Sequence, residues 1–133
     1  MKRIVIATAL FALTGLVQAN PTVEKDGVLT NKEGRTLYTF DKDSSGKSNC
    51  SGGCAGAWPP FAVANPALAG GDFSIVARED GGTQWAFKGK PLYFFAGDTK
   101  PGERNGDGQG GTWHVASPNK KAAVSGPAVP SAY

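Results

Sequence analysis

Two cysteines, Cys50 and Cys54, carry the most distinctive chemistry in this 133-residue chain. A C-x-x-x-C turn can bring two Cα atoms within the distance that a disulfide spans, and a lone cysteine pair in an exported chain is commonly oxidised. We therefore predict a structural disulfide. Two alternatives stay open. One is a redox-active dithiol, against which the three-residue spacing and the lack of an evident flanking helix argue. The other is copper binding by the reduced pair with His114.

Several aspartates have spacings that resemble part of a calcium-binding loop. Asp41 and Asp43 stand at alternate positions in "DKDSSG", and "NGDGQG" repeats the spacing around Asp107. Neither loop has the bidentate glutamate that closes a calcium loop at its twelfth position. The simpler interpretation is that Asp43 and Asp98 accept backbone N–H groups and end their strands. This interpretation is favoured, and calcium at Asp41, Asp43 and Asp107 is the alternative.

No arrangement of residues in the chain is typical of a catalytic site. The chain has one histidine, His114, between Trp113 and Val115. No G-x-S-x-G, H-E-x-x-H or P-loop motif is present. A histidine base would also need a nucleophile and an orienting acid. The sequence therefore names no catalytic residue and favours a non-enzymatic protein.

One phrase occurs twice in the chain. "GRTLYTFDKD" begins at residue 34 and "GKPLYFFAGD" at residue 89, an offset of 55. Such self-similarity indicates a structural repeat, and we predict two homologous halves, about 24–61 and 79–117. Seven residues of the first half recur in one ungapped frame in the second half. They are Gly27, Gly34, Leu37, Tyr38, Phe40, Asp43 and Trp58, which match Gly82, Gly89, Leu92, Tyr93, Phe95, Asp98 and Trp113.

The first 19 residues indicate export. A short basic start precedes an apolar run from Ile4 to Val17, which ends at the small-x-small sequence Val17-Gln18-Ala19. These features are typical of a signal peptide, so we expect residues 1–19 to be removed and the mature chain to begin at Asn20. The apolar run is too short for a comfortable membrane span, and no second run follows. We predict a periplasmic or secreted protein with no transmembrane segment.

The charge of the mature chain argues against nucleic-acid binding. Without Lys2 and Arg3, 12 basic residues remain of the 14 in the chain, against 11 acidic residues, so the net charge falls from +3 to +1. Nucleic-acid binding depends on a strong basic surface. We therefore predict no nucleic-acid partner.

The runs between glycines and prolines predict strands rather than helices. The breaks at 31–34 and 87–90 suit hairpins, with Gly34 and Gly89 able to adopt positive φ. "FSIVARE" at 73–79 and "TWHVAS" at 112–117 add strands. We predict one all-β domain over residues 20–118, an antiparallel meander of roughly six to eight short strands that forms a small sandwich or barrel from two homologous repeats. Residues 119–133 are expected to be a disordered tail.

The aromatic residues supply the remaining candidate surface. Most should form the core, because aromatic rings dominate burial in a small domain, and each of Trp58 and Trp113 should pack against the base of its own loop. Rings left exposed in both halves would form a binding surface for a glycan, a peptide or a flat ligand. By elimination, we predict an exported binding or envelope-associated module with an unknown envelope or extracellular ligand. The alternative is a periplasmic redox-active dithiol or metal-binding protein, with copper or calcium.

The two motif copies also carry a resemblance to a known family. Tyr38-x-Phe40-x-x-Asp43 and Tyr93-x-Phe95-x-x-Asp98, with "CSGGCAGAWPP" and "GDGQGGTWHVASP", resemble the secreted bacterial repeat proteins described as lipoproteins with a conserved Yx(FWY)xxD motif. The resemblance covers nearly all of the mature chain and implies a secreted or envelope-attached protein built of paired repeats. The chain lacks the lipobox cysteine of the lipoprotein members, since Cys50 and Cys54 lie deep in the mature sequence.

Overall fold

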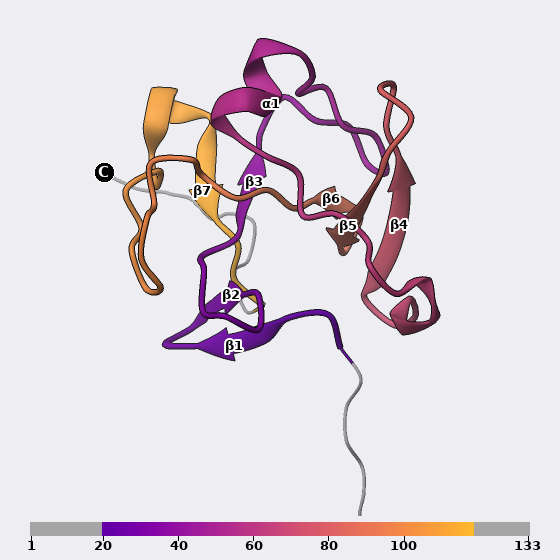
Figure 1. Ribbon diagram of the computed structural model, residues 1–133, viewed down its shortest axis with the longest axis horizontal. Coiled ribbons are helices and arrows are strands. Elements are labelled where there is room, and N and C mark those ends of the chain that lie inside the picture. Colours follow the sequence, from indigo (N-terminus) through magenta and orange to yellow (C-terminus); the bar gives the residue numbers. More distant parts are fainter. Residues whose placement is uncertain (1–19, 119–133) are drawn as a thin grey trace, which may run out of the picture.

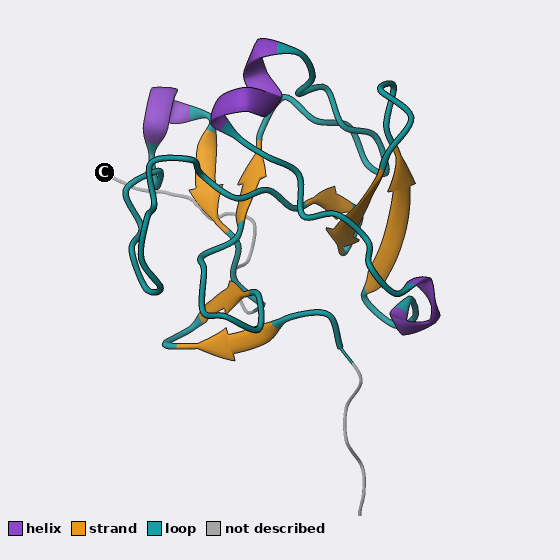
Figure 2. Ribbon diagram, viewed as in Figure 1, coloured by secondary structure: helices purple, strands orange, loops and turns teal. Residues whose placement is uncertain are grey.

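The computed structural model describes residues 20–118, so the expected signal peptide (1–19) and the expected disordered tail (119–133) lie outside the described residues. The described chain is built mainly from short strands joined by long loops (Figure 1, Figure 2). The strands are β1 (Val23–Lys25), β2 (Val28–Thr30), β3 (Tyr38–Phe40), β4 (Phe73–Ala77), β5 (Thr83–Phe87), β6 (Lys90–Pro91) and β7 (Trp113–Val115). The helical pieces are α1 (Gly53–Ala57) and two 3₁₀ turns, η1 (Pro66–Leu68) and η2 (Gln109–Gly111).

The strands form three small antiparallel sheets, with the orders β1-β2, β3-β7 and β4-β5-β6. This confirms the all-β prediction, and the sheets do not close into a barrel. In the second half, the hairpin predicted at 87–90 forms with Lys88 and Gly89 at its turn between β5 and β6, with φ values of 53° and 83°. In the first half, Gly34 also has a positive φ of 89°. The turn predicted at 31–34 forms there too, since Thr30 bridges Thr36 and the N–H of Leu37 donates to the carbonyl of Leu29 at 3.0 Å. The following strand, β3, pairs with β7.

The two halves are related by a pseudo-two-fold axis that passes between Tyr38 and Tyr93, as their hydrogen bonds show. Each of these residues donates its backbone N–H to the carbonyl of the other, at 2.8 and 2.9 Å. Tyr38 also pairs with Val115, and its counterpart Tyr93 makes the equivalent bridge with Pro60. The repeats therefore join along their motif strands, and each completes the hydrogen bonding of the other.

The motif segments run between two hydrophobic clusters. Successive residues of a strand face opposite sides, and Leu37 and Tyr38 are both fully buried, as are Leu92 and Tyr93. The leucines lie in one cluster and the tyrosines in the other. This explains why both alternating faces of the repeated phrase are apolar. One cluster contains Leu29, Leu37, Phe73, Trp85, Leu92 and Ala116, and the other contains Tyr38, Cys50, Trp58, Tyr93 and Trp113.

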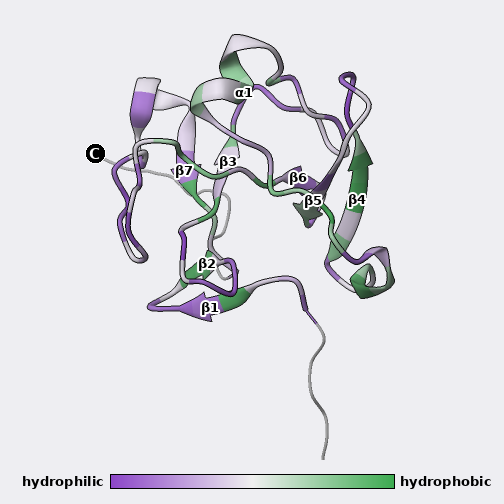
Figure 3. Cartoon of the chain, viewed as in Figure 1, coloured by the Kyte–Doolittle hydropathy of each residue, from purple (hydrophilic) through white to green (hydrophobic). Residues whose placement is uncertain are grey.

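One hydrophobic strand, β4, lies at the edge of its sheet. Its residues are mostly hydrophobic (Figure 3). Phe73 and Val76 are buried, whereas Ile75 keeps 37% of its surface exposed.

In the part of the chain that the structure describes, no helix is long and apolar enough to cross a membrane.

Candidate functional site

The motif side chains meet across the two repeats. The hydroxyl of Tyr38 donates to Oδ2 of Asp98 at 2.6 Å, and the hydroxyl of Tyr93 donates to Oδ2 of Asp43 at 2.7 Å. Each tyrosine therefore binds the aspartate of the other repeat. Hydrogen bonds to an ionised carboxylate are short and about twice as strong as neutral ones. The Tyr-x-Phe-x-x-Asp motif thus joins the repeats through two reciprocal hydrogen bonds.

The other oxygen of each motif aspartate accepts a backbone N–H from the following loop. Asn49 donates to Oδ1 of Asp43 at 2.7 Å, and Asn105 donates to Oδ1 of Asp98 at 2.9 Å. The prediction that these aspartates accept backbone N–H groups is confirmed. The tyrosine partners were not predicted, because the sequence does not show which repeat a motif side chain will face.

Four aromatic rings form a continuous stack across the same axis. The indoles of Trp58 and Trp113 are nearly parallel, with an interplanar angle of 1° and ring centroids 3.8 Å apart. Phe40 stacks on Trp113 at 4.1 Å, and Phe95 stacks on Trp58 at 4.4 Å. Each phenylalanine therefore stacks on the tryptophan of the other repeat. The expectation that each indole packs against the base of its own loop did not include this pairing between the repeats.

Gly106 also lies where the motif side chains of the two repeats meet, and the ungapped comparison of the repeats does not reveal it. Its N–H donates to the Tyr38 hydroxyl at 3.1 Å. A Cβ at this position would lie 2.6 Å from Cη2 of Trp58 and 3.0 Å from Cγ of Phe95. The position therefore requires glycine for space. Its neighbour Asn105 and the equivalent Asn49 are 56 residues apart rather than 55, so an ungapped comparison does not align them.

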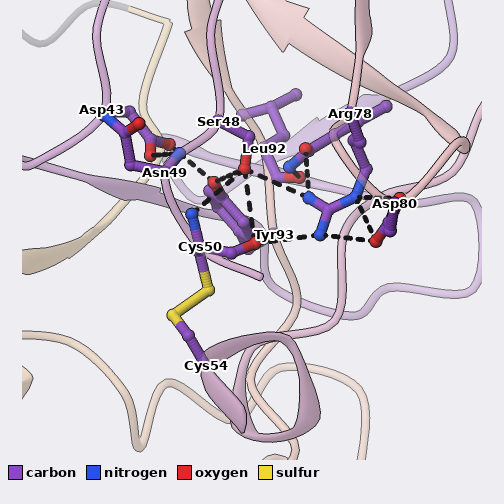
Figure 4. Close-up of a disulfide and its surroundings, with 10 residues drawn as sticks. Asp43, Ser48, Asn49, Cys50, Cys54, Arg78, Asp80, Leu92 and Tyr93 are labelled. Atoms are coloured by element: carbon purple, nitrogen blue, oxygen red, sulfur yellow. Dashed lines mark hydrogen bonds and ion pairs between the residues drawn. A yellow bond between two sulfur atoms is a disulfide. The ribbon is translucent and has the colours of Figure 1, made fainter. Parts of the chain in front are cut away.

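A buried arginine connects the first loop, which runs from Asp43 to Trp58, to the rest of the molecule (Figure 4). Arg78 is only 7% exposed. Its guanidinium donates to Oε1 of Gln84 at 2.8 Å, to the carbonyl of Cys50 at 2.9 Å and to the hydroxyl of Ser48 at 3.1 Å. It also forms an ion pair with Asp80 at 3.0 Å. The sequence offered no signal for Arg78, because it has no counterpart in the first repeat.

The cysteines lie at the other end of this loop. The sulfur atoms of Cys50 and Cys54 are 2.02 Å apart, in a disulfide. Cys54 lies in the first turn of α1, so the expectation that no helix flanks the pair is wrong. This five-residue helix is held at its C-terminal end by the N–H of Trp58, which donates to the carbonyl of Cys54 at 2.8 Å. The disulfide therefore closes the loop that leads from Asp43 to Trp58.

The two halves differ in the environment of their motif aspartates. Asp98 is only 3% exposed, whereas Asp43 is partly exposed. Burial raises the pKa of Asp43, and the N–H of Asn49 and the hydroxyl of Tyr93 oppose this effect. Burial also raises the pKa of Tyr38 and of Tyr93 far above the ordinary tyrosine value, and the neighbouring carboxylates add to the increase. Both tyrosines are therefore neutral hydrogen-bond donors at physiological pH.

The structure does not bring the candidate calcium ligands together. Asp43 binds Tyr93 and Asn49, Asp41 binds Nε2 of His114 at 2.8 Å, and Oδ1 of Asp107 accepts the N–H of Val115 at 3.1 Å. Within residues 20–118, no group of three or more histidine, cysteine, aspartate or glutamate side chains is placed to hold a metal ion. The cysteines that were candidate copper ligands are joined to each other.

A surface hollow of about 310 Å³ lies away from the motif. Its lining combines apolar residues with polar ones and consists of Pro21, Asn31, Lys32, Glu33, Phe61, Ala62, Ala64, Asn65, Leu68 and Trp85. We call this hollow the Trp85 groove. Its volume is at the lower end of the range for ligand sites, which are typically apolar clefts with a few polar groups at the rim.

Sequence comparison gives one match. Residues 22–62 and 74–117 match the sequence model of a family described as a secreted repeat of unknown function. The two matched segments correspond to the two halves related by the pseudo-two-fold axis. No curated protein and no solved structure matches the chain.

Proposed function

This chain belongs to the family described as a secreted repeat of unknown function, and from that premise we propose that it is an exported, non-enzymatic binding module. The family description supports export, and the predicted signal peptide agrees with it. We place the protein in the periplasm or outside the cell. We propose that the Trp85 groove is its ligand site.

The observation that carries this proposal is the contrast between the motif and the groove. The motif tyrosines and tryptophans are at most 7% exposed, and the tyrosine hydroxyls are hydrogen-bonded within the protein. They are therefore poorly placed to meet a ligand. The Trp85 groove instead offers partly exposed apolar side chains, Phe61 and Leu68, next to polar groups at its rim. Clefts that combine apolar side chains with a few polar groups are typical of ligand sites.

The two groups that could carry catalytic or redox chemistry, His114 and the Cys50–Cys54 disulfide, make contacts that suit a structural role. His114 is hydrogen-bonded to Asp41 and connects β7 with the residue that follows β3. The disulfide restrains a loop whose Ser48 hydroxyl lies 2.6 Å from the Tyr93 hydroxyl. These roles favour a binding module over the redox alternative.

The proposal can be tested by nuclear magnetic resonance on isotope-labelled protein titrated with an envelope extract. Backbone amide signals of residues that line the Trp85 groove should shift, and Ala64→Arg should abolish the shifts by filling the groove. The matched control is Ala77→Arg, at an exposed alanine of β4 outside the groove. Shifts that avoid the groove, or that survive Ala64→Arg, would contradict the proposed site.

A further inference from the structure

The segment 61–63 pairs with residues 83–85 of β5, along the edge of β5 that faces away from β4. The N–H of Trp85 donates to the carbonyl of Phe61 at 2.9 Å, and the N–H of Val63 donates to the carbonyl of Thr83 at 3.4 Å. Between them, Ala62 lies opposite Gln84 in an antiparallel bridge. In antiparallel pairing, alternate residues direct their backbone groups away from the partner strand. The N–H and the carbonyl of Ala62 therefore face away from β5.

These outward groups have no internal partner in the described chain. Within residues 20–118, the backbone N–H and carbonyl groups of Ala62 and Ala64 make no hydrogen bond. Both residues are exposed, and both line the Trp85 groove. Two residues along a strand span about 6.8 Å, which is also the repeat of hydrogen-bonding groups along the edge of an extended peptide. The wall of the groove is therefore a short, unpaired strand edge.

The other lining residues include a polar rim without net charge. Lys32 and Glu33 are adjacent, exposed and of opposite sign. The Oδ1 atom of Asn31 already accepts the N–H groups of Glu33 and Arg35, at 3.1 and 2.8 Å. Oδ1 of Asn65 similarly accepts the N–H of Ala67 at 3.1 Å. The side-chain NH₂ groups of both asparagines remain available as donors, which suit the carbonyl groups of a peptide.

We infer that the Trp85 groove binds an extended, uncharged peptide segment of a partner protein, which adds as a strand along Ala62–Ala64. This inference rests on the proposed function and names its ligand class. Strand addition obtains affinity from main-chain hydrogen bonds and specificity from pockets for alternate side chains. Here the pocket is the apolar surface that Phe61 and Leu68 contribute to the lining, and it takes one aliphatic side chain of the peptide. The rim, with one positive and one negative charge, complements a segment without net charge.

The probe for this inference is an acetylated and amidated heptapeptide, Thr-Val-Thr-Leu-Thr-Val-Thr, titrated into the labelled full chain. The amide signals of Ala62 and Ala64 should shift, and their hydrogen exchange should slow at least tenfold on binding. Two further peptides carry N-methyl groups on alternate residues, one on the threonines and the other on the aliphatic residues. A strand is paired through one edge only, so one methylated peptide should bind at least tenfold more weakly and the other should bind like the parent.

Matched protein variants test the backbone donor. Ala62→Pro removes the outward N–H and should weaken peptide binding at least tenfold, whereas Ala77→Pro on the edge strand β4 should leave it unchanged. Thermal melting and the amide spectrum establish that each variant is folded. If Ala62→Pro does not fold, Ala64→Arg replaces it, with the same expected loss of binding.

The outcomes separate this inference from the proposed function. Equal binding of both methylated peptides would overturn strand addition. If the heptapeptide does not bind while the envelope extract still shifts the groove amides, the ligand class is wrong and the binding module stands. If a chain ending at residue 118 binds the heptapeptide at least tenfold more tightly than the full chain, the chain's own residues 119–133 occupy the groove. That result would overturn the assignment to a partner protein.

Discussion

The hydrogen bond between Tyr38 and Asp98 should be the largest single polar contribution to the association of the two repeats. Tyr38 is fully buried and Asp98 is 3% exposed, so water cannot replace a lost partner. Tyr38→Phe removes the donor at 2.6 Å and the acceptor for the N–H of Gly106. Hydrogen bonds to charged groups contribute about 1.5–3 kcal/mol. We therefore expect Tyr38→Phe to lower the free energy of unfolding by about 3 kcal/mol.

A double-mutant cycle isolates the contact between the repeats. Chemical denaturation of wild type, Tyr38→Phe, Asp98→Asn and the double variant should give a coupling energy of about 1–2 kcal/mol, as for residues in direct contact. The control cycle combines Tyr38→Phe with Asp43→Asn, in the same repeat. Its coupling should be within about 0.5 kcal/mol of zero. Coupling to Asp43 and none to Asp98 would refute the crossed arrangement.

The matched contact in the other half should be weaker. Tyr93 donates to Asp43 at 2.7 Å, and Asp43 is partly exposed. Water can therefore solvate its carboxylate after Tyr93→Phe, and we expect a loss of about 1–2 kcal/mol. The difference in burial between Asp43 and Asp98 therefore predicts unequal losses at the two matched contacts. Equal losses for Tyr38→Phe and Tyr93→Phe would show that burial does not control the effect.

Three other perturbations test the same arrangement. Phe40→Ala and Phe95→Ala should each lower the free energy of unfolding by about 2–3 kcal/mol, because each removes a partly buried outer ring of the stack; unchanged denaturation curves would show that the rings do not stabilise the fold. In an alkaline titration followed by ultraviolet absorbance, Tyr38 and Tyr93 should ionise only as the protein unfolds, because burial raises their pKa values. Their contribution to stability is therefore complete below the ordinary tyrosine pKa of about 10 and is lost as the pH rises further, so ionisation of both tyrosines near pH 10 in the folded protein would contradict their burial. EDTA should leave the melting temperature unchanged, because protein donors already bind the aspartate carboxylates, and a decrease that calcium reverses would instead indicate a metal site.

Much of the fold could be predicted from the sequence. The repeated phrase located β3 and the segment of β6 that leads to Tyr93, which itself takes part only in isolated bridges, and Gly34 and Gly89 marked the turns before them. The pairing of β3 with β7 could not be predicted, because strand partners far apart in sequence depend on which faces pack together. The short helix α1 was missed because five residues are too few to show helical periodicity.

The contacts of the motif side chains could be predicted only in part from the sequence. The aspartates were correctly predicted to accept backbone N–H groups, which is a local property. The crossing of each tyrosine to the other repeat is a tertiary property, and nothing in a single repeat indicates it. Arg78 is buried by partners that lie as far away as Ser48, so its sequence neighbours gave no sign of its role. The Trp85 groove combines residues from four separate segments and was equally hidden.

The most direct test of the crossed motif is the set of nuclear Overhauser effects from the two tyrosine rings in the labelled protein. The ring protons of Tyr38 should contact the amide proton of Gly106, in the second loop, because that N–H donates to the Tyr38 hydroxyl at 3.1 Å. The ring protons of Tyr93 should contact Ser48, in the first loop, whose hydroxyl lies 2.6 Å from that of Tyr93. Contacts of Tyr38 with Ser48 and of Tyr93 with Gly106 would show that each motif closes within its own repeat, and would contradict the account.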